Sequence, residues 1–177
     1  DWFRDFSPRP VQEKVFIEQL EMAVENRLPL FLHQRDASDA FLSILRDYRP
    51  RITRAVVHCF TDDRATLFGL LDLDCHIGIT GWICDERRGR HLKELVPSIP
   101  SDRLMIETDA PYLIPRDLDP KPKTQRNEPM HLAHIAAVIA RCVEKPLTQL
   151  AQETTQVAEA FFGLDARPPS QENSADS

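Results

Sequence analysis

Short apolar runs that stop abruptly at polar or charged residues recur along this chain. Four of them cover residues 29–32, 54–57, 76–80 and 103–106. Short apolar runs bounded by polar residues are typical of buried strands in a parallel sheet. His33 follows the first run, His58 the second, and Glu107 and Asp109 the last. The pattern therefore predicts four strands, three of which deliver imidazole or carboxylate groups at their carboxyl ends.

Apolar residues at helical spacing occupy the segments between and after these runs. The predicted helices are 11–27, 36–48, 63–73, a segment through Leu92 and Leu95, 130–143 and 147–162. Ser7 before Pro8 is the expected start signal of the first helix, and Asn127 the expected cap of the fifth. The strand ends recur roughly every 25 residues, which is the pitch of a repeated strand–helix unit. The sequence predicts an α/β fold, and periodicity alone fits either a small doubly wound sheet or half of an eight-stranded barrel.

Composition limits the functions that this fold can carry. A chain of 177 residues that is 42% hydrophobic can bury one sizeable core, and a polar tail at 165–177 is expected to be disordered. The net charge of −6 argues against a protein that coats nucleic acid by its own charge. It leaves room for an enzyme that meets phosphate through a bound cation.

Cysteine usage and hydropathy suggest where the protein works. The four cysteines show no CxxC spacing, which suits free thiols in a reducing compartment. No run approaches the length of a membrane span, and no signal peptide opens the chain. We therefore expect a cytoplasmic protein without membrane contact.

The residues at the strand ends form a plausible metal site. In α/β folds the carboxyl ends of parallel strands meet at one rim, where ligands bind. His33, His58 and Asp109 would supply two imidazoles and one carboxylate to a divalent cation, leaving positions for water and a phosphoryl or carbonyl oxygen. Glu107 could orient or deprotonate that water, and Arg35 could hold an anion. The alternative is a pair of hydrogen-bonded histidines beside an exposed acid.

Two further histidines have a weaker case. His131 and His134 lie three residues apart on one predicted helix face, a spacing that can bind metal. Surface or partly buried histidines without a metal are the more frequent outcome.

Five ordered segments resemble the TatD family of metal-dependent deoxyribonucleases. They are HQRD at 33–36, HCFT at 58–61, ITGW at 79–82, ETDAPY at 107–112 and RNEP at 126–129. The segment 81–89 is similar to the bacterial branch of the family, and the resemblance covers about residues 1–164. It implies a TIM-like (β/α)8 barrel of the metal-dependent hydrolase type. It also implies 3′-to-5′ exonuclease activity on single-stranded DNA and RNA, which would fit a role in DNA repair.

The resemblance also carries site residues and one departure. His33 and His58 match metal ligands of the family, Asp109 the acid at the last strand, and Glu107 a carboxylate needed for activity. The family's further ligand is a Glu in a Gly-Glu-x-Gly-Leu-Asp segment whose final Asp resembles Asp1. The resemblance therefore implies strands five to eight, the C-terminal half of a barrel, with that Glu upstream.

The expected cofactor is Mg2+, with Mn2+ or Zn2+ as alternatives, and the expected substrate is single-stranded DNA or RNA. The intact parent is expected to be a monomer, whereas this stretch alone would have doubtful activity. Two other functions stay open. One is an amidohydrolase that cuts a small amide or ester, and the other is an inactive truncated fragment.

Overall fold

The computed structural model of the chain describes residues 1–164 and contains one parallel sheet. Its strands pair in the order β1-β2-β3-β4, and they are β1 (Leu30–Leu32), β2 (Ala55–Val57), β3 (His76–Ile79) and β4 (Leu104–Ile106). The predicted α/β class and the four predicted strands are confirmed. The tail predicted at 165–177 lies outside the described residues.

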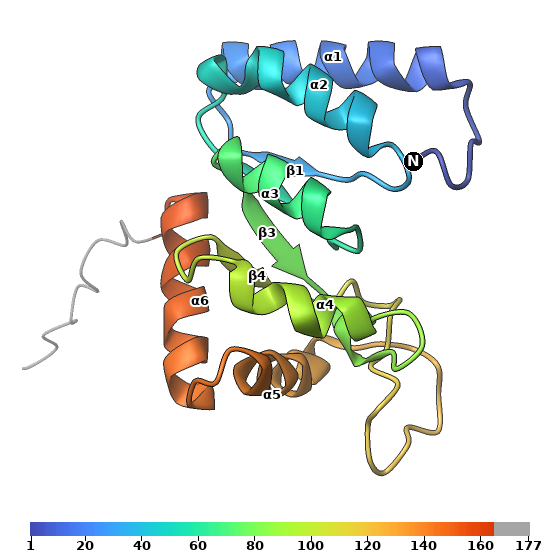
Figure 1. Cartoon of the computed structure of the whole chain (residues 1–177), viewed down its shortest axis with the longest axis vertical. Helices are drawn as coiled ribbons and strands as arrows, with labels where there is room; N and C mark the ends of the chain where they lie inside the picture. The colour runs from blue at the N-terminus through green and yellow to red at the C-terminus, as the bar shows by residue number, and fades with distance from the viewer. Residues whose placement is uncertain (165–177) are drawn as a thin grey trace, which may run out of the picture.

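Six α-helices surround this sheet, close to the positions that the apolar spacing predicts. They are α1 (Arg9–Asn26), α2 (Ser38–Tyr48), α3 (Arg64–Asp72), α4 (Arg90–Leu95), α5 (Leu132–Cys142) and α6 (Leu147–Phe162). Figure 1 shows α1 and α2 at one end of the molecule near β1, and α5 and α6 at the other end near β4. Among the described residues, no helix is long and apolar enough to cross a membrane.

The order of the strands decides between the two architectures that the spacing left open. In a doubly wound sheet the chain reverses direction across the sheet, so that strands adjacent in sequence are not all adjacent in space. Here every strand pairs in parallel with the next strand in the chain, without a reversal. Sequential parallel strands with helices between them are the arrangement of a (β/α)8 barrel wall.

The core lies between the sheet and its helices. Alternation along each strand sends Ala55 and Val57 of β2 into this core, and Val56 into a second cluster with Met105 and Phe161. Leu67 and Leu45 are fully buried against the sheet from α3 and α2. At about 25 cal/mol per Å2 of apolar surface removed from water, such side chains each stabilise the fold by about 2 kcal/mol.

The two predicted helix start signals are wrong in detail. Pro8 itself occupies the position before α1, and the Ser7 side chain makes no capping hydrogen bond. Glu128, not Asn127, caps the short 3-10 helix η4 (Pro129–His131) that leads into α5. Asn127 is instead buried, and its side-chain amide donates to the carbonyl oxygens of Thr108 and Tyr112, 2.7 Å away in each case. It closes the loop after β4 rather than starting a helix.

Candidate metal centre at the strand ends

The imidazole of His58 lies between two carboxylates at the carboxyl ends of the strands. His58 Nδ1 is 2.9 Å from Glu107 Oε2, and His58 Nε2 is 3.5 Å from Asp109 Oδ1. His58 follows β2, and both acids follow β4, so the contacts span the width of β3. The predicted meeting of His58, Glu107 and Asp109 at one rim is therefore seen in the structure.

A glycine in the intervening strand makes this reach possible. A Cβ atom on Gly78 of β3 would collide with Glu107 Oε1 and would also lie 3.4 Å from the Cα atom of His58. Because Gly78 has no side chain, the Glu107 side chain crosses β3 and arrives beside β2. A glycine inside a strand often marks such a close approach.

Glu107 is held by both of its oxygens. Oε2 faces His58 Nδ1, and Oε1 accepts a hydrogen bond from the backbone N–H of Cys59 at 2.5 Å. A carboxylate only accepts hydrogen bonds, so the proton of a neutral His58 lies on Nδ1 and the Nε2 lone pair faces Asp109. Carboxylates commonly orient metal-binding histidines in this way.

The charges around His58 favour a proton or a cation between its Nε2 atom and Asp109. Burial opposes protonation of His58, but the hydrogen bond to Glu107 and the charges of Glu107 and Asp109 raise the pKa of the imidazole overall. A lone pair on Nε2 facing a carboxylate oxygen at 3.5 Å is repulsive unless a proton or a cation lies between them. The donor set therefore fits a divalent cation held by His58 and Asp109.

Cys59 is a third donor that the sequence reasoning did not select. Its Sγ and one ligand atom each from His58 and Asp109 all lie within 4.8 Å of one another. Burial raises the pKa of the Cys59 thiol to about 11, and its Sγ lies 3.3 Å from Thr80 Oγ1. The thiol is thus neutral at pH 7, and only its place directly after His58 could have pointed to it.

His33 lies beside this group without joining it. The rings of His33 and His58 are 6.0 Å apart between centroids, but His33 Nε2 lies 3.2 Å from Asp1 Oδ2. Burial and the neighbouring His58 lower the pKa of His33, so its imidazole is neutral at pH 7. A neutral imidazole is the form that binds a metal.

Arg35 is placed at the rim beside aromatic rings. Its guanidinium carbon lies 3.7 Å from the centroid of the Phe3 ring and 5.9 Å from that of Trp82. Among residues 1–164, no carboxylate lies within ion-pair distance of Arg35. Its charge is therefore available to a bound anion.

The backbone is unusual at the same rim. Asp36, Cys59 and Asp109 follow β1, β2 and β4, and each has a positive φ, of 55°, 49° and 59°. Residues other than glycine rarely adopt this left-handed backbone region, which five further non-glycine residues among 1–164 share. The sequence offered no sign of this, because none of the three residues is a glycine.

His131 and His134 do not form a joint site. His131 Nδ1 lies 2.9 Å from Asn127 Oδ1, whereas His134 Nε2 lies 2.7 Å from Asp117 Oδ1. The predicted shared helix face is wrong because His131 belongs to η4, and only His134 belongs to α5.

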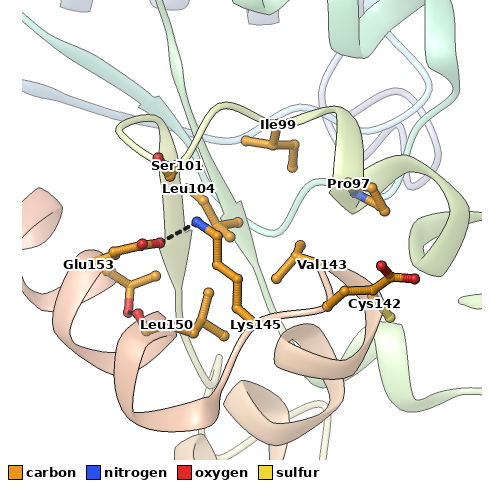
Figure 2. Close-up of a pocket in the computed structure, with 11 residues that line it drawn as sticks. Pro97, Ile99, Ser101, Leu104, Cys142, Val143, Lys145, Leu150 and Glu153 are labelled. Atoms are coloured by element: carbon orange, nitrogen blue, oxygen red, sulfur yellow. Dashed lines mark hydrogen bonds and ion pairs between the residues drawn. The ribbon is translucent and has the colours of Figure 1, made fainter.

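A cavity beside α5 and α6 lies away from these residues. Figure 2 shows this cavity of about 420 Å3, in which the Lys145 ammonium points to Glu153 at 2.5 Å. Its wall includes Leu104, the first residue of β4, whereas Asp109 lies beyond the last residue of that strand. Because this cavity opens at the amino end of the strands, it is not the place of the chemistry.

Comparison with known proteins identifies the family to which the chain is similar. The family model of TatD-related DNase matches residues 1–163. The chain is 48% identical over 165 residues to the 3′-5′ ssDNA/RNA exonuclease TatD of Klebsiella pneumoniae, and 49% identical over 164 residues to that of Erwinia amylovora. Each match covers 93% of this chain and 63% of the relative. The chain thus spans less than two thirds of the length of these relatives.

Solved structures share the fold. The structure of YJJV, a TatD homolog from Escherichia coli, superimposes with a TM-score of 0.78 at 26% identity, covering 89% of this chain and 60% of the other. An uncharacterized amidohydrolase from Saccharomyces cerevisiae gives a TM-score of 0.78 at 23% identity, covering 92% and 62%. With the family model matching nearly all the described residues, this chain belongs to the TatD-related DNase family.

Proposed function

We propose that the protein is a metal-dependent exonuclease that removes nucleotides from the 3′ end of single-stranded DNA or RNA. The observation that carries the proposal is the His58 imidazole held between Glu107 and Asp109 at the strand ends. The substrate class and the direction of digestion come from the names of the relatives, which are 48–49% identical. The four free cysteines suit a cytoplasmic place, and we expect the intact protein to act as a monomer.

His58 Nε2 and Asp109 would hold the cation, with His33 close enough to join after its side chain turns away from Asp1. Carboxylate oxygen favours Mg2+ or Mn2+, whereas the imidazoles also suit Zn2+, and we expect Mg2+ to support activity. When bound, the cation would supply Lewis acidity toward the phosphodiester and toward an attacking water.

In this proposal Glu107 positions His58 rather than acting as the base. Both of its oxygens are engaged, one by His58 Nδ1 and the other by the N–H of Cys59. These two contacts direct the carboxylate toward His58 and the backbone after β2. Glu107 keeps the proton of His58 on Nδ1, and thereby keeps the Nε2 lone pair available to the cation.

A cationic and aromatic surface next to the centre suits a nucleic acid strand. Two guanidinium groups lie near the Trp82 ring, with Arg88 at 4.4 Å from its centroid and Arg35 at 5.9 Å. Tyr112, three residues after Asp109, is 72% exposed. Aromatic rings stack on bases of any sequence, and arginines bind phosphates, so this surface would hold single strands without base specificity.

The test compares carboxylates at the two ends of one strand. Asp109→Asn removes the charge after β4, and Asp102→Asn is the matched control because Asp102 precedes β4 and is exposed. In the intact parent protein, with Mg2+ and a 5′-labelled single-stranded oligonucleotide, we expect Asp109→Asn to lower kcat/KM about a hundredfold or more. Asp102→Asn should retain the original rate, and circular dichroism should report the same fold for both.

Near-normal digestion by Asp109→Asn in metal-replete buffer would overturn the assignment. Hydrolysis of small amides or esters with no digestion of oligonucleotides would favour an amidohydrolase instead. Single-nucleotide products released from the labelled oligonucleotide from its 3′ end, and abolished by EDTA, are the expected result.

A further inference from the structure

A second group of metal-binding side chains lies outside the centre at the strand ends. It consists of Cys84, Asp117 and His134, which share no residue with the first group. One ligand atom from each of the three lies within 4.8 Å of the others, and His134 Nε2 is 2.7 Å from Asp117 Oδ1.

The three residues come from different elements. Cys84 is the last residue of the 3-10 helix η2 (Gly81–Cys84), Asp117 belongs to the long loop between β4 and α5, and His134 lies in the first turn of α5. The three residues are therefore not neighbours simply because they share one face of a helix. The fold brings a thiol, a carboxylate and an imidazole to one point.

Burial gives the group an inner and an outer side. Cys84 is fully buried, whereas the side chains of Asp117 and His134 are 26% and 29% exposed. A cation there would be held by sulfur from within, and by nitrogen and oxygen at the surface. The remaining position would face solvent and could take a water molecule.

The donor types select the cation. Sulfur, imidazole nitrogen and carboxylate oxygen together are the ligands of Zn2+, whereas Mg2+ and Ca2+ prefer oxygen alone. A thiolate and a carboxylate would balance the two charges of the ion. Lys93 and Arg141 are close enough to favour the thiolate, although burial and Asp117 keep the pKa of the free Cys84 thiol well above its usual range.

We propose that Cys84, Asp117 and His134 bind a structural Zn2+ ion that fastens the loop after β4 to η2 and α5. The preceding residue of the loop reinforces this geometry, because Arg116 Nε lies 3.2 Å from Asp85 Oδ2. Consecutive loop residues 116 and 117 thus meet consecutive residues 85 and 84. The ion would join Asp117 to Cys84, next to the ion pair between Arg116 and Asp85.

This loop follows β4 and contains Asp109 of the candidate catalytic centre. The far end of the loop is fixed to its beginning by Asn127, whose side-chain amide donates to the carbonyl oxygens of Thr108 and Tyr112. Between these points Cys84 and Asp85 hold the middle of the loop. Zn2+ at Asp117 would therefore limit the motion of the segment that carries Asp109, without taking part in the reaction.

Cobalt substitution gives a test that does not depend on activity. Co2+ bound by a thiolate has a sulfur-to-metal charge-transfer band in the near ultraviolet, which oxygen and nitrogen ligands do not produce. The purified protein is titrated with Co2+ and then with Zn2+, alongside Cys84→Ser, His134→Gln and the matched control Cys59→Ser. Cys59 is the thiol of the first group, so the control assigns the band to one centre or the other.

We expect the band in the original protein and in Cys59→Ser, and its loss in Cys84→Ser. His134→Gln should weaken Co2+ and Zn2+ binding at this centre by about tenfold to a hundredfold. Zn2+ should displace Co2+ and raise the melting temperature of the original protein by more than that of Cys84→Ser. His134 is partly exposed, so His134→Gln keeps the test decisive if Cys84→Ser fails to fold.

Absence of the band in the original protein would overturn the proposal. Loss of the band in Cys59→Ser with retention in Cys84→Ser would also overturn it, since the thiolate would then belong to the first centre. Retention of full Zn2+ affinity by His134→Gln would do the same.

Discussion

At the scale of single residues, the missing side chain of Gly78 is as important as the side chains that meet above it. Glu107 directly follows β4 and His58 directly follows β2, and their contact passes over the backbone of β3. A search for polar residues at strand ends finds both partners but not the glycine between them. The requirement becomes visible only when strands distant in sequence are placed side by side.

Substitution of Gly78 by Ala should therefore impair the reaction through Glu107. The added Cβ would displace the Glu107 carboxylate and release His58 Nδ1, so we expect kcat to fall about tenfold to a hundredfold. Steady-state kinetics on a single-stranded oligonucleotide measures the loss. Gly69→Ala in α3 is the control, because its Cβ would meet only the flexible end of Leu42 at 3.1 Å. Unchanged kcat in Gly78→Ala would contradict the positioning role of Glu107.

Arg35 should contribute to binding of the strand more than to turnover. We expect Arg35→Gln to raise KM for single-stranded DNA by about tenfold and to reduce the slope of log K against log salt by about one. Arg46→Gln is the matched control, because Arg46 is exposed on α2, away from the rim. A fall in kcat at unchanged KM would instead show that Arg35 stabilises the transition state.

At this scale the sequence predicted which side chains share a rim better than the contacts that they make. The apolar runs placed His58, Glu107 and Asp109 at one rim because parallel strands share an edge. The same reasoning could not see that His134 turns to Asp117, because that contact depends on the path of an irregular loop. Periodicity describes regular elements and carries no information on loop paths.

At the scale of elements, Asp85 organises the turn between η2 and α4. Its side chain is 5% exposed and accepts hydrogen bonds from the backbone N–H groups of Arg87 and Arg88, at 3.0 and 3.2 Å. Burial opposes the charged form, but these bonds and the Arg88 guanidinium lower the pKa of Asp85 overall. Asp85 therefore holds this turn in its charged form from a buried position.

Asp85→Asn should destabilise the protein in a pH-dependent manner. Because the folded-state pKa is lowered, the contribution is present above the unfolded pKa of about 3.9 and is lost as the pH falls through the folded value. We expect the free energy of unfolding to fall by about 1 to 3 kcal/mol at pH 7, with the difference shrinking below about pH 4. Urea unfolding across this pH range measures it, and Glu94→Gln is the exposed control. A difference that grows on acidification would refute the argument.

At the scale of the whole molecule, the two ends of the sheet serve different purposes. The carboxyl ends carry His58, Glu107 and Asp109, whereas the amino end of β4 adjoins the cavity of Figure 2 and packs with α5 and α6. The prediction of an α/β fold and the positions of its helices were correct because burial repeats regularly in the sequence. The order in which the strands pair distinguishes a barrel wall from a doubly wound sheet. Periodicity could not predict this order, because it depends on contacts between residues that are far apart in the sequence.

This division predicts that changes at the amino end affect stability alone. Leu150 lines the cavity and is 1% exposed, so Leu150→Ala should lower the free energy of unfolding by about 2 to 5 kcal/mol. Leu147→Ala in the same helix is the control, because Leu147 is 44% exposed. At a temperature where both variants are folded, we expect kcat to match that of the original protein. A selective loss of kcat in Leu150→Ala would show that the two ends are coupled.

Because Cys59 and Asp109 have a left-handed backbone, a substitution that stabilises the protein at these positions would also impair its proposed activity. Glycine adopts a positive φ freely, so Asp109→Gly would relieve a backbone conformation that costs other residues about 1 kcal/mol or more. The same change would remove a carboxylate that faces His58 Nε2. Selection for thermal resistance alone would therefore favour glycine at the rim and remove a carboxylate that the proposed reaction requires.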